Sequence, residues 1–233
     1  MAKSESKKVD GSVWTIVVAG GSGRRFGSLK QYAELGGRRV MDMAVDTARQ
    51  YSDGVVLVVP AEDADHEGGV AGGPTRTASV RNGLAAVPAD AAVILVHDAA
   101  RPFASADLYR AVIDAVQQGA DGSVPGLPVT DTVKSIEVVE SGSLGLASSG
   151  AVPRVTGTPD RATLVAVQTP QAFRADALRR AYLTEVDATD DASLVEAIGG
   201  TVIVVPGEVD NRKITHPEDL EWARRYMQQR GTR

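Results

Sequence analysis

Short apolar runs alternate with amphipathic segments along most of this chain, and this alternation restricts the fold more than any other feature. Residues 13–19 (VWTIVVA), 54–60 (GVVLVVP) and 92–96 (AVILV) are rich in β-branched residues and read as buried strands. Helical spacing of apolar residues follows at 40–51, 77–86 and 105–118, with Ser105 as a candidate N-cap. Strands alternating with helices predict an α/β fold, a Rossmann-like, mostly parallel sheet with helices on both faces.

The alternation stops at residues 133–160 and then resumes. We expect strands at 164–168 and 201–206 and helices at 174–186, 191–198 and 217–229. The interrupting segment has one alternating stretch followed by glycine, serine, proline and threonine, so it cannot build a core of its own. It is either a disordered insertion or a β-arm that needs a partner surface. We expect residues 12–230 to form a single domain and residues 1–11 to be a disordered tail.

Composition excludes several classes of protein. The chain of 233 residues has no cysteine and three widely separated histidines, so disulfides, thiolate nucleophiles and a structural zinc are not expected. A net charge of −5 argues against general nucleic-acid binding, which needs a basic face. No apolar run approaches the roughly 20 residues of a membrane span, and no secretion signal is visible. We therefore expect a cytoplasmic protein.

A glycine-rich turn follows the first expected strand. Residues 19–27 read AGGSGRRFG, and Lys30 comes shortly after. Glycines let backbone N–H groups approach phosphate oxygens, and the flanking cations neutralise phosphate charge. The turn lacks the Gly-Lys-Ser/Thr ending of a Walker loop, and Phe26 breaks the Gly-x-Gly-x-x-Gly pattern of dinucleotide sites. The alternative is a plain strand-to-helix turn with surface arginines.

A second motif, HDAARP at 97–102, stands where the third expected strand ends. Ligands of parallel α/β sheets lie beyond the carboxyl ends of the strands, so Asp98 is placed to hold Mg²⁺ or a ribose hydroxyl. The alternative is that Asp98 and Arg101 only cap the next segment. Arg76 and Ser79 lie near the start of a helix, where they can contact a nucleotide or serve as ordinary capping residues.

Taken in order, eight segments of the chain resemble a known family. They are AGGSGRRFGSLKQY, GGPTRTASV, HDAARPF, PVTDTVK, PDR, QTPQAF, TDDAS and NRKITHPEDL. Together they are similar to the 2-C-methyl-D-erythritol 4-phosphate cytidylyltransferases of isoprenoid biosynthesis, from Val13 to Met227. The chain departs from the family pattern at Val18, where proline is usual, at Gly20, where alanine is usual, and in the short spacer before Lys30.

The resemblance implies an enzyme that transfers a cytidylyl group from CTP to a sugar-alcohol phosphate and releases pyrophosphate with a divalent metal such as Mg²⁺. It implies a homodimer in which residues 133–160 form an arm around the partner. It places Arg25, Lys30, Arg161 and Lys213 as catalytic residues, and Thr132, Thr169 and Thr189 on the sugar phosphate. Nucleotide contacts fall on Ala19, Gly20, Gly21, Ser22, Gly23, Arg76, Ser79, Asp98 and Ala99, with Asp98 also the metal ligand.

Other functions stay open at this point. A ribitol 5-phosphate cytidylyltransferase would share the glycine loop and much of HDAARP, and a sugar-phosphate nucleotidyltransferase that uses UTP or GTP is a broader alternative. A non-catalytic nucleotide sensor is a third possibility, because fold alone does not fix function. The match of QTPQ together with TDDAS favours 2-C-methyl-D-erythritol 4-phosphate.

Overall fold

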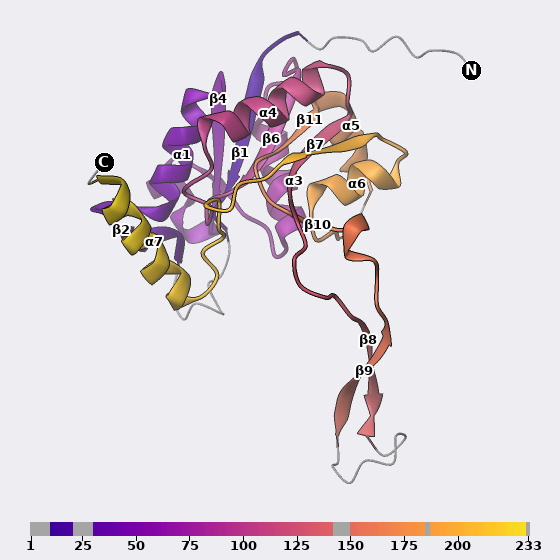
Figure 1. The fold of residues 1–233 in the computed structure, drawn as a ribbon. Coiled ribbons are helices and arrows are strands. Elements are labelled where there is room, and N and C mark those ends of the chain that lie inside the picture. The colour runs from indigo at the N-terminus through magenta and orange to yellow at the C-terminus, as the bar shows by residue number, and fades with distance from the viewer. Residues whose placement is uncertain (1–9, 21–29, 142–149, 185–186, 232–233) are drawn as a thin grey trace.

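The computed structural model describes residues 10–20, 30–141, 150–184 and 187–231. They form a central eight-stranded sheet covered by helices on both faces (Figure 1). Its strands are β1 Val13–Val18, β4 Gly54–Val59, β5 Val70–Ala71, β6 Val93–Asp98, β7 Gly122–Pro128, β10 Val165–Val167, β11 Gln171–Arg174 and β12 Val202–Pro206. The helices are α1 Val40–Gln50, α2 Ala64–Glu67, α3 Arg76–Ala86, α4 Ala106–Gln117, α5 Ala175–Ala181, α6 Asp191–Ala197 and α7 Pro217–Gly231.

Most of the sheet is parallel. Strand β1 pairs in parallel with β4 and β6, β4 with β5, and β7 with the edge strand β12. Strands β10 and β11 run antiparallel to their neighbours, and β11 lies between β6 and β7. The Rossmann-like, mostly parallel α/β fold expected from the sequence is thereby confirmed, with β10 and β11 as its two antiparallel strands.

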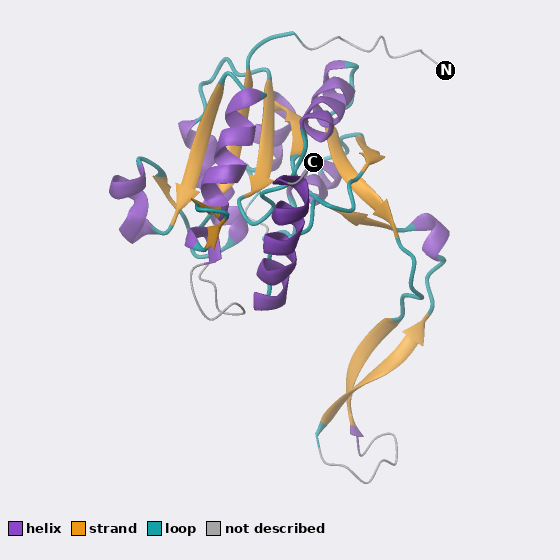
Figure 2. Ribbon diagram, turned by 60° about the vertical axis from the view of Figure 1, so that its left-hand side comes forward, coloured by secondary structure: helices purple, strands orange, loops and turns teal. Residues whose placement is uncertain are grey.

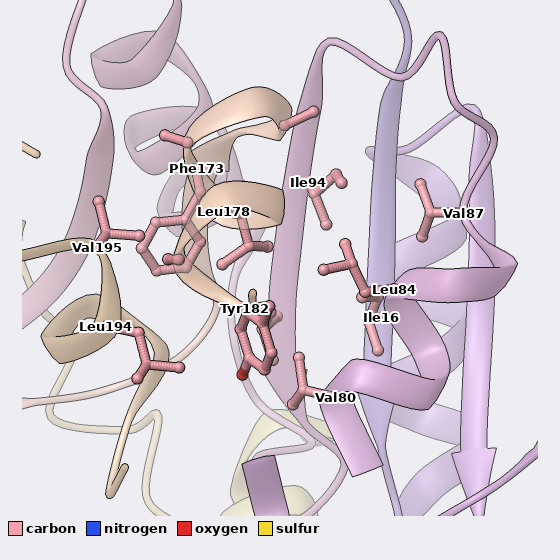
Figure 3. Packing of buried hydrophobic residues seen from close by; sticks show 14 of the residues in the cluster. Ile16, Val80, Leu84, Val87, Ile94, Phe173, Leu178, Tyr182, Leu194 and Val195 are labelled. Atoms are coloured by element: carbon pink, nitrogen blue, oxygen red, sulfur yellow. The ribbon is translucent and has the colours of Figure 1, made fainter. Parts of the chain in front are cut away.

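Alternate side chains of the central strands enter two different cores. In β1, Ile16 belongs to the core that contains residues of α3 and α5, whereas Val17 belongs to the core that contains residues of α1 and α4. In β6, Ile94 joins the first core and Leu95 the second. Figure 3 shows the first of these cores, where α3, α5 and α6 cover the sheet. Burial on both faces is why these strands read as continuous apolar runs.

Most expected elements appear within about two residues of their expected bounds. The side chain of Ser105 caps α4, since its Oγ accepts a hydrogen bond from the amide of Leu108 at 3.1 Å. The expected helix at 174–186 is wrong in length, because α5 ends at Ala181. Tyr182 is buried at its C-cap, and the next side chain, Leu183, is 82% exposed, so the apolar stripe stops there.

Two central strands were not expected from the sequence, β7 and β11. Strand β7 reads GSVPGLP, and glycine and proline are both depleted in strands. The glycines are required by close packing: a Cβ on Gly122 would lie 2.7 Å from the Phe173 ring, and one on Gly126 would lie 2.7 Å from Val204. These contacts exist only in the folded sheet and leave no periodic pattern in the sequence.

The segment between β7 and β10 forms a hairpin that extends from the body of the molecule (Figure 2). Strands β8 Ser135–Glu140 and β9 Ala151–Gly157 pair antiparallel with each other and with no other described strand. Of the two alternatives left by the sequence, the β-arm is therefore the one observed. A separate small hairpin joins β2 Glu34–Leu35 to β3 Arg38–Arg39.

Some expectations concern residues outside the described ranges. They are nearly all of the 1–11 tail, the arm segment 142–149, and Gly21, Ser22, Gly23 and Arg25 of the glycine-rich turn. Among the residues that are described, no helix combines the length and apolar character needed to cross a bilayer.

Candidate active site

Ala19, Asp98 and Ala99, three of the predicted nucleotide residues, lie at the carboxyl ends of β1 and β6. Ala19 follows β1 directly, and its amide donates to the carbonyl of Val58 at the end of β4 (2.7 Å). Ala99 follows β6, and its amide donates to the carbonyl of Val18 (3.0 Å). Asp98 is the last residue of β6, so the parallel register of β1 and β6 brings Asp98 beside the start of the glycine-rich turn.

Asp98 lies between two cations. Its Oδ2 is 2.6 Å from Nζ of Lys213, and its Oδ1 is 3.6 Å from Nε of Arg76. Burial by itself would raise the pKa of Asp98, but the charges of Lys213 and Arg76 outweigh it and hold that pKa well below the ordinary value. Asp98 is therefore ionised at neutral pH, which suits a metal ligand.

The loop after β12 brings Lys213 to this position. The amide of Ile214 donates to the carbonyl of Ala100 at 2.8 Å, and the Ile214 side chain is fully buried beneath α7 with Phe103 and Leu220. Burial of the residue next to it therefore fixes Lys213 in front of β6. The Lys213 side chain itself is 40% exposed, which leaves it access to a ligand.

Asn211 anchors the same loop from the other side. Its side-chain Nδ2 donates to the carbonyl of Thr169 at 2.9 Å, and its backbone carbonyl accepts from Nη1 of Arg101 at 2.7 Å. Arg101 is thus engaged with the Lys213 loop in this chain. The side-chain amide thus holds Thr169 as a donor without placing a charge in the core, and the backbone carbonyl holds Arg101.

The hydroxyl of Thr169, a predicted substrate contact, lies in a buried chain of hydrogen bonds. Its Oγ1 accepts from the amide of Asp98 at 3.0 Å and lies 3.1 Å from Nδ1 of His97. The other His97 nitrogen, Nε2, lies 3.1 Å from the carbonyl of Arg101 and must donate to it. Nδ1 is then the acceptor and His97 is neutral, in line with burial lowering the His97 pKa to about 4.

Arg76 enters the site from the first turn of α3. The helix is capped by Thr75, whose Oγ1 accepts from the amide of Ala78 at 3.1 Å. Nη2 of Arg76 donates to Oδ2 of Asp191 at 2.7 Å, while its Nε faces Asp98. Burial would lower the pKa of Arg76, but the charges of Asp191 and Asp98 outweigh this and raise it, so the guanidinium is permanently charged.

Ser79 shapes the loop before α3. Its Oγ donates to the carbonyl of Thr75 at 2.9 Å and accepts from the amide of Gly73 at 3.0 Å. A Cβ on Gly20 would lie 3.5 Å from this oxygen, so the turns after β1 and β5 approach each other at Ser79. Ser79 therefore borders Gly20 at the start of the glycine-rich turn, and its contact with the nucleotide stays a prediction.

Not all predicted residues are brought together. Thr132 and Arg161 lie at the base of the arm, and Nη1 of Arg161 donates to the carbonyl of Thr130 at 2.7 Å. Thr189 is exposed in the loop before α6. Lys30 begins a short 3₁₀ helix, Lys30–Tyr32, at the end of the undescribed stretch 21–29.

The structure adds Asp191 and Tyr182 to the site. Asp191 belongs to the TDDAS motif, but its position suggested only the start of a helix. Tyr182 has no motif, because it acts through a contact with Asp191 that depends on how α5 and α6 pack.

Comparisons with known proteins agree with this geometry. The family model described as 2-C-methyl-D-erythritol 4-phosphate cytidylyltransferase matches residues 13–229. The enzyme of that name from Nocardia farcinica is 43% identical over 95% of this chain and 96% of its own length. The bifunctional enzyme IspD/IspF of Anaeromyxobacter dehalogenans is 46% identical over 91% of this chain. This chain spans only 56% of that bifunctional relative.

Solved structures give the same result. The 4-diphosphocytidyl-2C-methyl-D-erythritol synthase of Anaerococcus prevotii is 31% identical, with a TM-score of 0.76, and the match covers 93% of this chain and 98% of that one. The 2-C-methyl-D-erythritol 4-phosphate cytidylyltransferase of Thermus thermophilus is 32% identical with a TM-score of 0.73, covering 91% and 98%. The chain therefore belongs to the 2-C-methyl-D-erythritol 4-phosphate cytidylyltransferase family of nucleotidyltransferases.

Proposed function

We propose that this chain transfers the cytidylyl group of CTP to 2-C-methyl-D-erythritol 4-phosphate. The products are 4-diphosphocytidyl-2-C-methyl-D-erythritol and pyrophosphate, in the non-mevalonate route to isoprenoids. The observation that carries the proposal is the ionised Asp98 paired with Lys213 and Arg76 at the end of β6, in a chain that matches this family from residue 13 to residue 229.

The reaction needs charge stabilisation more than acid or base catalysis. A phosphate oxygen of the substrate attacks the α-phosphorus of CTP, a new P–O bond forms, and the bond to the leaving pyrophosphate breaks. A phosphate dianion is already a nucleophile at neutral pH, so no proton has to be removed. Negative charge grows on the α-phosphoryl and pyrophosphate oxygens, and fixed cations lower that barrier. We assign this task to Lys213 on the substrate side and to Arg25 and Lys30 on the triphosphate.

The donor set suits a magnesium ion that arrives with the nucleotide. No cluster of three or more candidate ligands exists in the described part of the chain, and Asp98 is the carboxylate at the predicted position. Mg²⁺ is commonly held by one or two carboxylates together with substrate phosphates. We therefore propose Asp98 as its protein ligand. When bound, Mg²⁺ would neutralise phosphate charge.

Exposed apolar residues of the arm support a homodimer. Ile136, Val138 and Val155 on β8 and β9 are 59%, 71% and 57% exposed. A two-stranded hairpin is marginally stable alone, and a second copy would cover both arms reciprocally. We propose that the arm packs on the partner and carries Thr132 and Arg161 to the partner's sugar-phosphate site. The cytoplasmic location stays a prediction.

Release of pyrophosphate tests the proposal. The protein is incubated with Mg²⁺, each of CTP, UTP, GTP and ATP, and a panel of polyol phosphates. We expect the highest kcat/KM for CTP with 2-C-methyl-D-erythritol 4-phosphate. A higher kcat/KM with ribitol 5-phosphate would show that ribitol 5-phosphate is the acceptor substrate. A higher kcat/KM with another nucleotide would show that CTP is not the donor. No turnover with any pair would favour a nucleotide sensor.

A further inference from the structure

Five polar side chains form a continuous path from the hydrophobic core to the candidate active site. Neighbouring members contact each other, and the charged ones alternate in sign. From the core outward they are Tyr182, Asp191, Arg76, Asp98 and Lys213.

The members of this path differ in how exposed their side chains are. Lys213 is 40% exposed and carries a long flexible side chain, so it can leave Asp98 to contact a substrate phosphate. Asp191 is fully buried, and Arg76 is 24% exposed at its side chain. Once Lys213 has turned to the substrate, Arg76 is the ion-pair partner that stays on Asp98, and the charge of Arg101 acts on it from further away. The placement of Arg76 therefore decides where Asp98 points during the reaction.

Both oxygens of Asp191 are used to hold this arrangement. Oδ2 accepts from Arg76 at 2.7 Å, and Oδ1 accepts from the hydroxyl of Tyr182. Burial, followed by the charge of Asp191, raises the pKa of Tyr182, so the phenol keeps the proton that it donates. Figure 3 shows the Tyr182 ring within the core. Packing of the Tyr182 ring fixes the position of its hydroxyl, and the hydrogen bond from that hydroxyl orients the Asp191 carboxylate.

Asp191 is not required to start its helix. The N-cap of α6 is Asp190, whose Oδ1 accepts from the amide of Ser193 at 3.2 Å. Burying a carboxylate is costly unless it is paired, and an apolar residue would serve a purely structural position at least as well. The pairing with Arg76 therefore points to the site and not to the fold alone.

The start of α3 and the loop before α6 are also joined on either side of Arg76. Oγ1 of Thr75 donates to Oδ1 of Asp187 at 2.8 Å, and Oγ1 of Thr77 accepts from the amide of Ala188 at 3.1 Å. These contacts join the start of α3 to the loop that leads into α6 on both sides of Arg76. Three successive residues, Thr75, Arg76 and Thr77, therefore connect the start of α3 to residues 187–191.

We infer that Asp191, supported by the hydroxyl of Tyr182, is a positioning residue that holds Arg76 against Asp98 while Lys213 engages the substrate. The inference rests on the proposed function, since it gives Asp98 and Lys213 their roles in that reaction. It predicts that Asp191 affects catalysis only through Arg76.

A double-mutant cycle tests this dependence. Asp191→Asn, Arg76→Lys and the double variant are compared with the wild type in kcat/KM and in the Kd of CTP. We expect Asp191→Asn to lower kcat/KM about tenfold in the Arg76 enzyme and less than about twofold in the Arg76→Lys enzyme, with coupling of the same sign in the Kd. Equal losses in both backgrounds, or no loss in the Arg76 enzyme, would overturn the positioning role.

A second pair of variants tests the inference without changing the charge of any buried residue. Tyr182→Phe removes the hydroxyl that Asp191 accepts, and Tyr109→Phe removes another buried phenol, one with no hydrogen-bond partner among the described residues. We expect Tyr182→Phe to lower kcat/KM about threefold and Tyr109→Phe to leave it unchanged. Equal effects of the two changes would contradict the inference. The Kd series requires no turnover, so it decides the positioning role even if the proposed substrate is wrong.

Discussion

The ammonium of Lys213 lies 2.6 Å from Oδ2 of Asp98, and this ion pair joins the loop after β12 to the end of β6. The two residues are 115 positions apart in the sequence and meet because Ile214 is buried beside Ala100. The carboxylate that is proposed to serve the metal and the cation that is proposed to serve the substrate phosphate thus begin as partners. A ligand that takes either one changes the electrostatic surroundings of the other.

Asp98→Asn is expected to raise the Mg²⁺ concentration needed for half-maximal turnover. The substitution keeps the shape of the side chain and removes the charge that attracts the metal and balances Lys213 and Arg76. Turnover measured against Mg²⁺ concentration checks this, with Asp107→Asn at an exposed surface site as the matched control. Unchanged metal dependence would show that Asp98 serves the ribose or the fold instead.

His97 is expected to make the protein less stable as the pH falls. Its folded pKa of about 4 lies below its ordinary value of 6.5, so the unfolded chain takes up a proton first. The contribution is fully present above about pH 6.5, and up to about 3 kcal/mol of it is lost as the pH approaches 4. Urea unfolding between pH 7 and 4.5 measures this dependence.

The matching variant is His97→Gln, whose neutral amide can still donate toward the Arg101 carbonyl. It should show a weaker pH dependence of the free energy of unfolding over this range. His66→Gln changes an exposed histidine, with a side chain 87% accessible, and should keep the wild-type dependence. Identical pH profiles for wild type and His97→Gln would contradict a buried neutral His97.

Gly20→Ala is expected to stabilise the protein by about 0.4–1 kcal/mol, because alanine restricts the unfolded chain. A Cβ at this position would make only ordinary contacts, at 3.5 Å to Ser79 Oγ and 3.8 Å to Gly72 Cα. Gly73→Ala is the contrasting variant: its Cβ would lie 2.4 Å from that of Ala78, and a loss of about 1–3 kcal/mol is expected. Chemical denaturation measures the free energy of unfolding of both variants. A Gly20→Ala protein that is less stable than the wild type would refute the prediction.

Lys30→Ala and Arg161→Ala are each expected to be nearly inactive, and activity should reappear when the two proteins are mixed under conditions of subunit exchange. In a mixed dimer, the Arg161→Ala chain keeps its own Lys30 and receives Arg161 from the partner's arm. One site is then complete and the other carries both changes. Pyrophosphate release from verified mixed dimers measures this. If they stay as inactive as their parents, Arg161 does not act across the dimer.

Prediction from sequence worked best where burial imposes a regular spacing of apolar residues. The strand at residues 93–98 and the helix capped by Ser105 could be located because apolar spacing and a capping residue are local signals. It failed at β7 and at the end of α5, where the deciding contacts are the Phe173 ring against Gly122 and the burial of Tyr182. Those contacts are made by residues distant in the sequence, and no local pattern records them.

The sequence by itself determined the family, the Rossmann-like α/β fold, and the residues whose chemistry suits a nucleotide, because motifs and hydrophobic period are properties of consecutive residues. Only the tertiary structure decided which of these residues meet. It pairs Asp98 with Lys213 and Arg76, engages the Thr169 hydroxyl with His97, and places Arg161 at the base of the arm. The physical reason is that charges and hydrogen bonds act over a few ångströms in space, and the packing of helices on the sheet sets those distances.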